Sequence, residues 1–249
     1  MKQILGIDVG GTKIAAGLID KSFRVTKLAV LSTSQTDLVK QLVNLIGSYE
    51  SFSAIGLGMP GQVLANGMVT RLPNVNNFKS INFKKILEDK FKVPVNILND
   101  AKAFALAEAS IGVGRAYKTV AGVILGTGIG VGIIMDKKIY FGKDGIAGEY
   151  EHTVLLDSKM FRDHRHSTGT FKQAANTNKY LKTLLDMIVL SFNPDIIILG
   201  GAWSKLSGME KLANQLTKNV GNYINKTPVK ISKLKYAGII GAALPLLKK

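Results

Sequence analysis

The feature that most constrains this chain is a glycine turn between two short apolar segments at its start. Both segments have the length and composition of strands, and Gly10-Gly11 between them is typical of a hairpin turn. Glycine lets the backbone approach a ligand closely, and successive N–H groups in such a turn form a concave site for phosphate oxygens. Asp8 precedes the turn, where one carboxylate would bind Mg²⁺ through water. Taken alone, the segment is equally consistent with an ordinary hairpin that carries a solvated Asp8 and Lys13.

The composition is that of a globular protein. The chain has 249 residues, of which 46% are hydrophobic and 20% charged, so it has room for two modest domains with substantial cores. No apolar run reaches the roughly 18–20 residues that cross a bilayer, and no signal peptide is visible at the N-terminus. The absence of cysteine excludes disulfides, thiol nucleophiles and thiolate metal sites. We expect a cytoplasmic protein without a membrane partner.

The formal net charge of +16 is unusual and would attract polyanions. The lysines are scattered along the whole chain, with no basic block interleaved with aromatic residues and no recognisable helix-turn-helix. The signature of nucleic-acid binding is therefore incomplete, and a solvated lysine-rich surface explains the charge. We expect no nucleic-acid partner.

Strand and helix patterns alternate along the chain, which predicts an α/β protein. Strands are expected at residues 25–31, 54–58, 95–98, 120–125, 131–135, 195–199 and 229–234, and helices at 37–49, 83–91, 101–111, 171–192, 209–224 and 239–247. A second glycine-rich hairpin at residues 126–130 resembles the first. One such hairpin in each half predicts a duplicated two-domain fold with its cleft between the halves.

Further polar groups come at the ends of expected strands. Asn99-Asp100 follows one strand, and Gly200-Gly201 follows another and leads towards a helix. Ligands of α/β sheets bind at the carboxyl ends of strands, and helix N-termini favour anions. The chain has no GxxxxGK[ST] loop, which argues against a P-loop NTPase.

Taken together, these motifs resemble those of the ROK family of sugar kinases, a branch of the actin-like and hexokinase-like ATPases. The resemblance rests on Asp8-Val-Gly-Gly-Thr-Lys13, Gly56-Leu-Gly-Met-Pro-Gly61, Leu72-Pro-Asn74, Asn99-Asp100, Leu125-Gly-Thr-Gly-Ile-Gly130, Gly145-Ile-Ala-Gly-Glu149 with His152, Leu199-Gly-Gly201 and Gly241-Ala-Ala243. It implies a two-domain actin-like/hexokinase-like ATPase fold with ribonuclease H-like halves and a central cleft. The expected domains are residues 1–112, joined by the closing helix 238–249, and residues 113–237.

The resemblance also implies an activity, the ATP-dependent phosphorylation of a hexose or an N-acetylated amino sugar at the C6 hydroxyl. Asp100 matches the catalytic base of the family, which takes the proton from the attacking hydroxyl. From the residues alone, Asp100 could also be the N-cap of the helix that follows it, and the two roles are compatible.

Further site residues carry over position by position. The sugar-binding positions match Asn74, Asn99, Asp100, Glu149 and His152. The nucleotide-binding positions match Asp8, Gly10, Gly11, Thr12, Lys13, Gly126, Thr127, Gly128, Gly200 and Gly201, with Asp8 also matching the carboxylate linked to Mg²⁺ through water. The expected partners are a small-molecule sugar, ATP and a second copy of the chain in a dimer.

One segment departs from the family pattern. Many members carry a CxCGxxGC zinc motif after the His of the Glu-x-x-His element, whereas this chain has His164-x-His166 there and no cysteine. A zinc site of His152, His164 and His166, with Asp163 or water as fourth ligand, is one interpretation. The other, which we favour, is that zinc was lost and the histidines are solvated. Lys172 stands near the position of a further sugar-contacting Glu, and lysine accepts no hydrogen bond.

This departure keeps one alternative function open, a non-catalytic sugar- or nucleotide-binding regulator derived from a sugar kinase. Repressors related to the family carry an N-terminal DNA-binding domain, whereas here Met1 precedes the first expected strand by only a few residues. We therefore expect a kinase rather than a repressor.

Overall fold

The computed structural model describes residues 3–34, 36–64, 66–72, 78–126, 128–150, 174–220 and 226–247. The chain forms two compact units. Unit 1 comprises Met1–Ala107, Phe141–Ile146 and Lys235–Lys249, and unit 2 comprises Glu108–Tyr140 and Ala147–Leu234. Each unit is built around its own five-stranded sheet.

The sheet of unit 1 has the strand order β3-β2-β1-β4-β8. Its strands are β1 (Gln3–Val9), β2 (Lys13–Ile19), β3 (Val25–Ser32), β4 (Phe52–Met59) and β8 (Val95–Asn99). The first three pair antiparallel as consecutive hairpins, while β4 and β8 continue the sheet parallel to β1. The carboxyl ends of β1, β4 and β8 therefore meet at one edge of this sheet.

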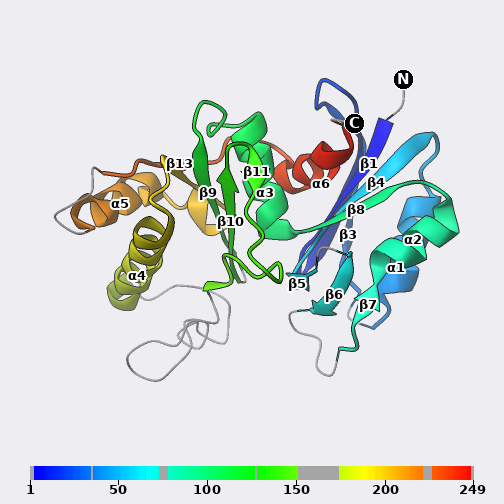
Figure 1. The fold of residues 1–249 in the computed structure, drawn as a ribbon, viewed down its shortest axis with the longest axis horizontal. Helices are drawn as coiled ribbons and strands as arrows, with labels where there is room; N and C mark the ends of the chain where they lie inside the picture. The colour runs from blue at the N-terminus through cyan, green and yellow to red at the C-terminus, as the bar shows by residue number, and fades with distance from the viewer. Residues whose placement is uncertain are drawn as a thin grey trace. The chain divides into compact units, whose positions relative to one another are not determined.

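Helices cover both faces of the first sheet (Figure 1). On one face, apolar side chains of α1 (Leu38–Gly47) and α2 (Phe83–Phe91) join the sheet residues in a single core. Asp37 and Asn82 cap these two helices by accepting the N–H of the residue three positions on, each at 2.9 Å. A small second sheet of β5 (Gln62–Val63), β6 (Met68–Arg71) and β7 (Ile81–Asn82) adds to this unit.

The opposite face of the sheet is covered by the last helix, α6 (Ala237–Leu247), so the two ends of the chain lie side by side (Figure 1). Gly6 and Gly56 are paired in register on β1 and β4, and both face the backbone of α6. A Cβ at Gly6 would lie 2.6 Å from the carbonyl oxygen of Ile239. A Cβ at Gly241 would overlap the backbone of Ala103 in α3 (Asp100–Ser110). Glycine at these positions allows α6 to pack closer than side chains would permit.

The sheet of unit 2 repeats the strand order of the first, as β11-β10-β9-β12-β13. Its strands are β9 (Thr119–Leu125), β10 (Ile129–Met135), β11 (Lys138–Ile139), β12 (Ile196–Gly200) and β13 (Val229–Ile231). Again three strands are antiparallel hairpins and two continue parallel to the first. Side chains of α4 (Ala174–Phe192) and α5 (Met209–Leu216) complete its core.

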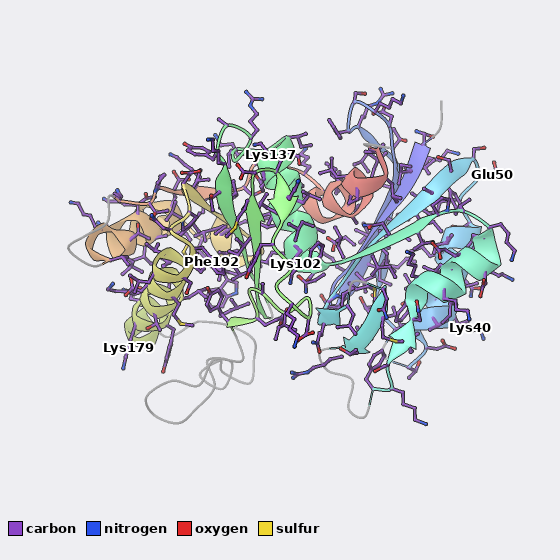
Figure 2. The ribbon with its side chains drawn as sticks, in the orientation of Figure 1. Lys40, Glu50, Lys102, Lys137, Lys179 and Phe192 are labelled. Carbon is purple, nitrogen blue, oxygen red and sulfur yellow. The ribbon has the colours of Figure 1, made fainter. Side chains whose placement is uncertain are left out.

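The end of α3 is tied to the hairpin tip between β10 and β11. The ammonium group of Lys137 donates to the carbonyl oxygens of Ala109 at 2.9 Å, Arg115 at 2.5 Å and Tyr117 at 3.1 Å (Figure 2). A cation at a helix C-terminus satisfies carbonyl groups that have no partner within the helix. Nearby, the buried Glu108 accepts from the Ser232 hydroxyl at 2.5 Å, and burial raises the pKa of this carboxyl group.

The predicted α/β class is confirmed, while two elements end three or more residues before the predicted position. The helix expected at residues 209–224 ends at Leu216, and Thr217–Asn219 forms a 3₁₀ turn. The Thr217 hydroxyl donates to the carbonyl oxygen of Ala213 at 3.2 Å and so competes with the helical backbone. The strand expected at 229–234 ends at Ile231, whose N–H donates to the Glu210 carboxylate. In the described ranges, no helix combines the length and the apolar character that a membrane span requires.

The close packing of α6 leads to a stability prediction. The substitution Gly56→Ala would place a Cβ 2.7 Å from Cα of Ala243, so strand or helix must shift. We expect a loss of about 1–3 kcal/mol in the free energy of unfolding, as for overpacked cores. Gly47→Ala, where no atom lies within 4 Å of the new Cβ, is the control and should cause no loss. Urea unfolding measures both, and equal stabilities of the two variants would contradict the prediction.

Candidate functional site

The candidate site residues of unit 1 gather at the carboxyl edge of its sheet. Asp8 lies next to the end of β1 and is paired with Gly58 of β4, which is paired in turn with Leu98 of β8. Asp100 begins α3 two residues beyond Leu98. Since neighbouring strands are about 4.8 Å apart, Asp8 and the end of β8 are separated by about 10 Å across the sheet. Both carboxylates therefore lie at the edge where α/β sheets bind ligands.

The first glycine turn joins β1 to β2 at this same edge. The N–H of Gly10 donates to the carbonyl oxygen of Lys13 at 2.9 Å and closes the turn. Thr33, directly after β3, makes two hydrogen bonds to this turn. Its hydroxyl donates to the carbonyl oxygen of Gly10 at 2.8 Å. Its N–H donates to the carbonyl oxygen of Thr12 at 3.0 Å. The side chains of Thr12 and Lys13 at the tip are exposed.

The Asp8 carboxylate lies next to two glycine residues, Gly238 and Gly58. A Cβ at Gly238, the second residue of α6, would overlap the Asp8 carboxylate, and one at Gly58 would lie 3.7 Å from its Oδ1. Glycine at position 238 therefore makes room for the carboxylate, whereas a Cβ at position 58 would make only an ordinary van der Waals contact with it. Loss of solvation raises the pKa of Asp8 to about 6, and the positive charge of Lys13 opposes part of that rise.

The donor set here fits Mg²⁺ better than a metal held by protein ligands alone. In the part of the chain that the structure describes, no group of three or more His, Cys, Asp or Glu side chains could hold a metal ion. Mg²⁺ commonly binds through one or two carboxylates together with substrate phosphates and water. A desolvated carboxylate such as Asp8, beside a turn suited to phosphate, meets that requirement.

Asn99 and Asp100 divide two roles at the start of α3. The Oδ1 atom of Asn99 accepts the N–H of Lys102 at 3.1 Å, so Asn99 is the N-cap of the helix. Its Nδ2 donates to the carbonyl oxygen of Gly61 at 3.0 Å, which ties α3 to the turn after β4. The alternative role considered for Asp100, capping α3, thus belongs to Asn99. Asp100 is half-buried in the first turn, where its Oδ1 accepts the N–H of Ala101 at 2.8 Å.

Two consequences follow for these neighbours. Asn99 keeps one amide hydrogen and one lone pair beyond its two bonds, which are the groups that a sugar hydroxyl could use. Lys102, which is labelled in Figure 2, stands in the first turn of α3. It is almost fully buried. The sequence did not predict that Lys102, two residues after Asp100, is buried, because lysine is rarely buried.

Unit 2 brings its two glycine turns to one edge of its own sheet. β9 and β12 are parallel neighbours, with Gly200 paired to Ile124. The turn after β9 is closed by the N–H of Gly126, which donates to the carbonyl oxygen of Gly128 at 3.0 Å. Gly201 has φ +86°, and a Cβ there would overlap the carbonyl oxygen of Leu125. The predicted nucleotide-binding turns of this unit therefore lie next to each other.

The remaining predicted residues divide into described and undescribed ones. Glu149 is described and half-buried; the preceding Gly148 packs against Val131 of β10, close to the second glycine turn. Asn74, Thr127, His152, Asp163, His164, His166 and Lys172 lie outside the described residues. The two interpretations of the histidine segment thus stay predictions.

The sequence analysis missed Thr33 and Gly238. Thr33 had a weak signal, a hydroxyl residue directly after an expected strand. Gly238 had none, because its closeness to Asp8 arises only when the last helix returns to the first strand.

Comparison with known proteins places this geometry in context. The sequence model of the ROK family matches residues 4–167. The chain is 28% identical to N-acetylgalactosamine kinase AgaK of Shewanella sp. (strain ANA-3), covering 96% of this chain and 95% of that protein. It is 27% identical to N-acetyl-D-glucosamine kinase of Photobacterium profundum, covering 98% and 99%. Its fold matches a ROK family glucokinase from Streptomyces griseus, solved with glucose and AMPPNP, with a TM-score of 0.78, 22% identity and 98% of each chain covered.

The fold and the family of this chain follow from these findings. The paired sheets of identical strand order, each with a glycine hairpin after its first strand, belong to the actin-like ATPase fold, as predicted. Within that fold, the chain belongs to the ROK family.

The pKa of Asp8 leads to a prediction about pH and stability. Because the folded-state value of about 6 exceeds the ordinary 3.8, the stability that Asp8 contributes is full below pH 3.8 and is lost as the pH rises through about 6. In EDTA at pH 8, Asp8→Asn should therefore be more stable than the wild type, by up to about 3 kcal/mol. This advantage should shrink as the pH falls from about 6 to about 4.

Urea unfolding across this pH range measures the effect. Asp89→Asn, on the exposed side of α2, is the control and should show no comparable pH-dependent gain. An advantage of Asp8→Asn that stayed constant from pH 4 to pH 8 would contradict the assigned desolvation.

Proposed function

We propose that this protein transfers the γ-phosphoryl group of ATP to the C6 hydroxyl of a hexose or an N-acetylated amino sugar, with Asp100 as general base. The general class, sugar kinase, follows from membership of the ROK family and from relatives that are named as sugar kinases over nearly their full length. The position of the hydroxyl and the roles of individual residues are parts of the proposal.

The observation that carries it is the placement of Asp100. This carboxylate stands in the first turn of an 11-residue helix, at the edge where the parallel strands β1, β4 and β8 end. The positive end of the helix dipole lies at this first turn. Because Asn99 caps the helix, the N-cap role does not account for Asp100.

The proposed step is a phosphoryl transfer with balanced proton movement. The sugar hydroxyl oxygen forms a bond to the γ-phosphorus while its proton passes to the Asp100 carboxylate. The bond between the γ-phosphorus and the bridging oxygen breaks, and ADP leaves with that electron pair. Such transfers depend mostly on positioning and on compensation of charge, so the base chiefly orients the hydroxyl.

The glycine turns supply that positioning in the proposal. The turns at Gly10–Thr12 and Gly126–Gly128 would hold phosphate oxygens through backbone N–H groups, and Gly200-Gly201 would lie against the adenosine. Asp8 would hold Mg²⁺ through water. Mg²⁺, when bound, neutralises charge that develops on the phosphate oxygens.

The sugar would be selected by amide and carboxylate groups. Asn99 offers one amide hydrogen and one lone pair, and the family resemblance adds Asn74, Glu149 and His152. A site that hydrogen-bonds hydroxyl groups strongly rejects analogues that lack them. The named relatives act on N-acetylgalactosamine and N-acetyl-D-glucosamine, so N-acetylated amino sugars are the first candidates alongside glucose.

A panel of sugars tests the function directly. With ATP and Mg²⁺, we expect ADP release that depends on one or a few of glucose, mannose, fructose, N-acetylglucosamine, N-acetylgalactosamine and N-acetylmannosamine, measured by a coupled assay. The phosphorylated position is identified by NMR of the product. ATP hydrolysis that no sugar changes, or sugar binding without turnover, would contradict a kinase, and the latter would favour a regulator.

Replacing the proposed base tests the mechanism. We expect Asp100→Asn to lower kcat by about 10²–10⁴-fold, the usual contribution of general acid–base catalysis, with little change in sugar affinity. Asp136→Asn is the matched control because Asp136 is exposed at φ +47°, a conformation that asparagine tolerates well. Turnover by Asp100→Asn close to that of the control would refute the assignment.

A further inference from the structure

Thr33 makes two hydrogen bonds to a single turn, the glycine turn between β1 and β2. It lies one residue beyond the end of β3 and 23 residues from Gly10 in the sequence. Its hydroxyl donates to the Gly10 carbonyl oxygen at 2.8 Å, and its N–H donates to the Thr12 carbonyl oxygen at 3.0 Å. The carbonyl groups of Gly10 and Thr12, which accept these bonds, therefore point towards the end of β3.

The geometry of the peptide bond gives this arrangement a consequence for ligand binding. The described chain contains no cis peptide bond, so the carbonyl group of Gly10 and the N–H of Gly11 point in opposite directions within their shared plane. Fixing the Gly10 carbonyl oxygen towards Thr33 thus fixes the Gly11 N–H on the opposite side. A peptide flipped the other way would present a carbonyl oxygen there, which repels phosphate.

We propose that Thr33 is a positioning residue for the first phosphate turn: its hydroxyl holds the Gly10–Gly11 peptide in the orientation that presents N–H rather than C=O to phosphate. The proposal rests on the proposed function, in which this turn binds ATP. Thr33 itself need not touch the nucleotide.

The structure separates this role from simple support of the sheet. The pairing of β2 with β3 is made by backbone groups, with Lys13 opposite Ser32 at this end. The bond to the Gly10 carbonyl oxygen, by contrast, comes from the Thr33 side chain. Thr26 makes the same kind of bond at the other end of the strand pair, from its hydroxyl to the Leu18 carbonyl oxygen at 3.4 Å, far from the turn. It offers a matched control.

The experiment compares ATP with adenosine, which shares the base and sugar but has no phosphate. Calorimetry measures the Kd of each ligand for the wild type, Thr33→Val, Thr33→Ser and Thr26→Val. We expect Thr33→Val to weaken ATP binding about three- to tenfold, the worth of one hydrogen bond, without changing adenosine binding. Thr33→Ser should restore ATP binding, and Thr26→Val should match the wild type for both ligands. Thr33→Ala replaces Thr33→Val should the latter fail to fold.

Three outcomes would overturn the proposal. Unchanged ATP binding by Thr33→Val, an equal loss for ATP and adenosine, or failure of Thr33→Ser to restore ATP binding would each assign Thr33 a purely structural role. These results leave the proposed function standing when the wild type still phosphorylates a sugar. A wild type that binds no ATP removes both the proposed function and the role of Thr33.

Discussion

The structure of unit 1 depends on the close contact between α6 and the sheet, which glycine residues make possible. Gly6 and Gly56, side by side on β1 and β4, leave no side chain between the strands and the helix backbone. Gly241 does the same towards α3. This packing fixes the start of α6, so that Gly238 stands against Asp8. The carboxylate is thereby desolvated beside the first glycine turn, which explains its raised pKa.

The two units share one sheet topology. In each sheet, a hairpin of three antiparallel strands is extended by two parallel ones, and a glycine turn follows the first strand. In unit 1 the parallel extension ends in Asn99 and Asp100, and in unit 2 it ends in Gly200 and Gly201. The same topology therefore ends in polar side chains in one unit and in bare backbone in the other. We relate this difference to the two halves of the proposed reaction, a sugar hydroxyl and a nucleotide.

Much of this could be predicted because the signals are local. Apolar strands, glycine turns and residues at strand ends follow from patterns of a few residues, and their order predicted both the α/β class and the ROK resemblance, which are confirmed. The division of roles between Asn99 and Asp100 was not predictable, since both residues cap helices well. Which one does so depends on the backbone angle at the end of β8 and on the position of Gly61.

The elements, the glycine turns and the polar residues that follow the strands were predictable without the structure, because they depend on near neighbours in the chain. The hydrogen bonds from Thr33 to the first turn and the contact of Gly238 with Asp8 arise only when the chain folds. Those contacts join residues 23 and 230 positions apart, on segments whose own patterns contain no information about each other. Their proximity results from strand order and helix packing, which are properties of the folded chain as a whole.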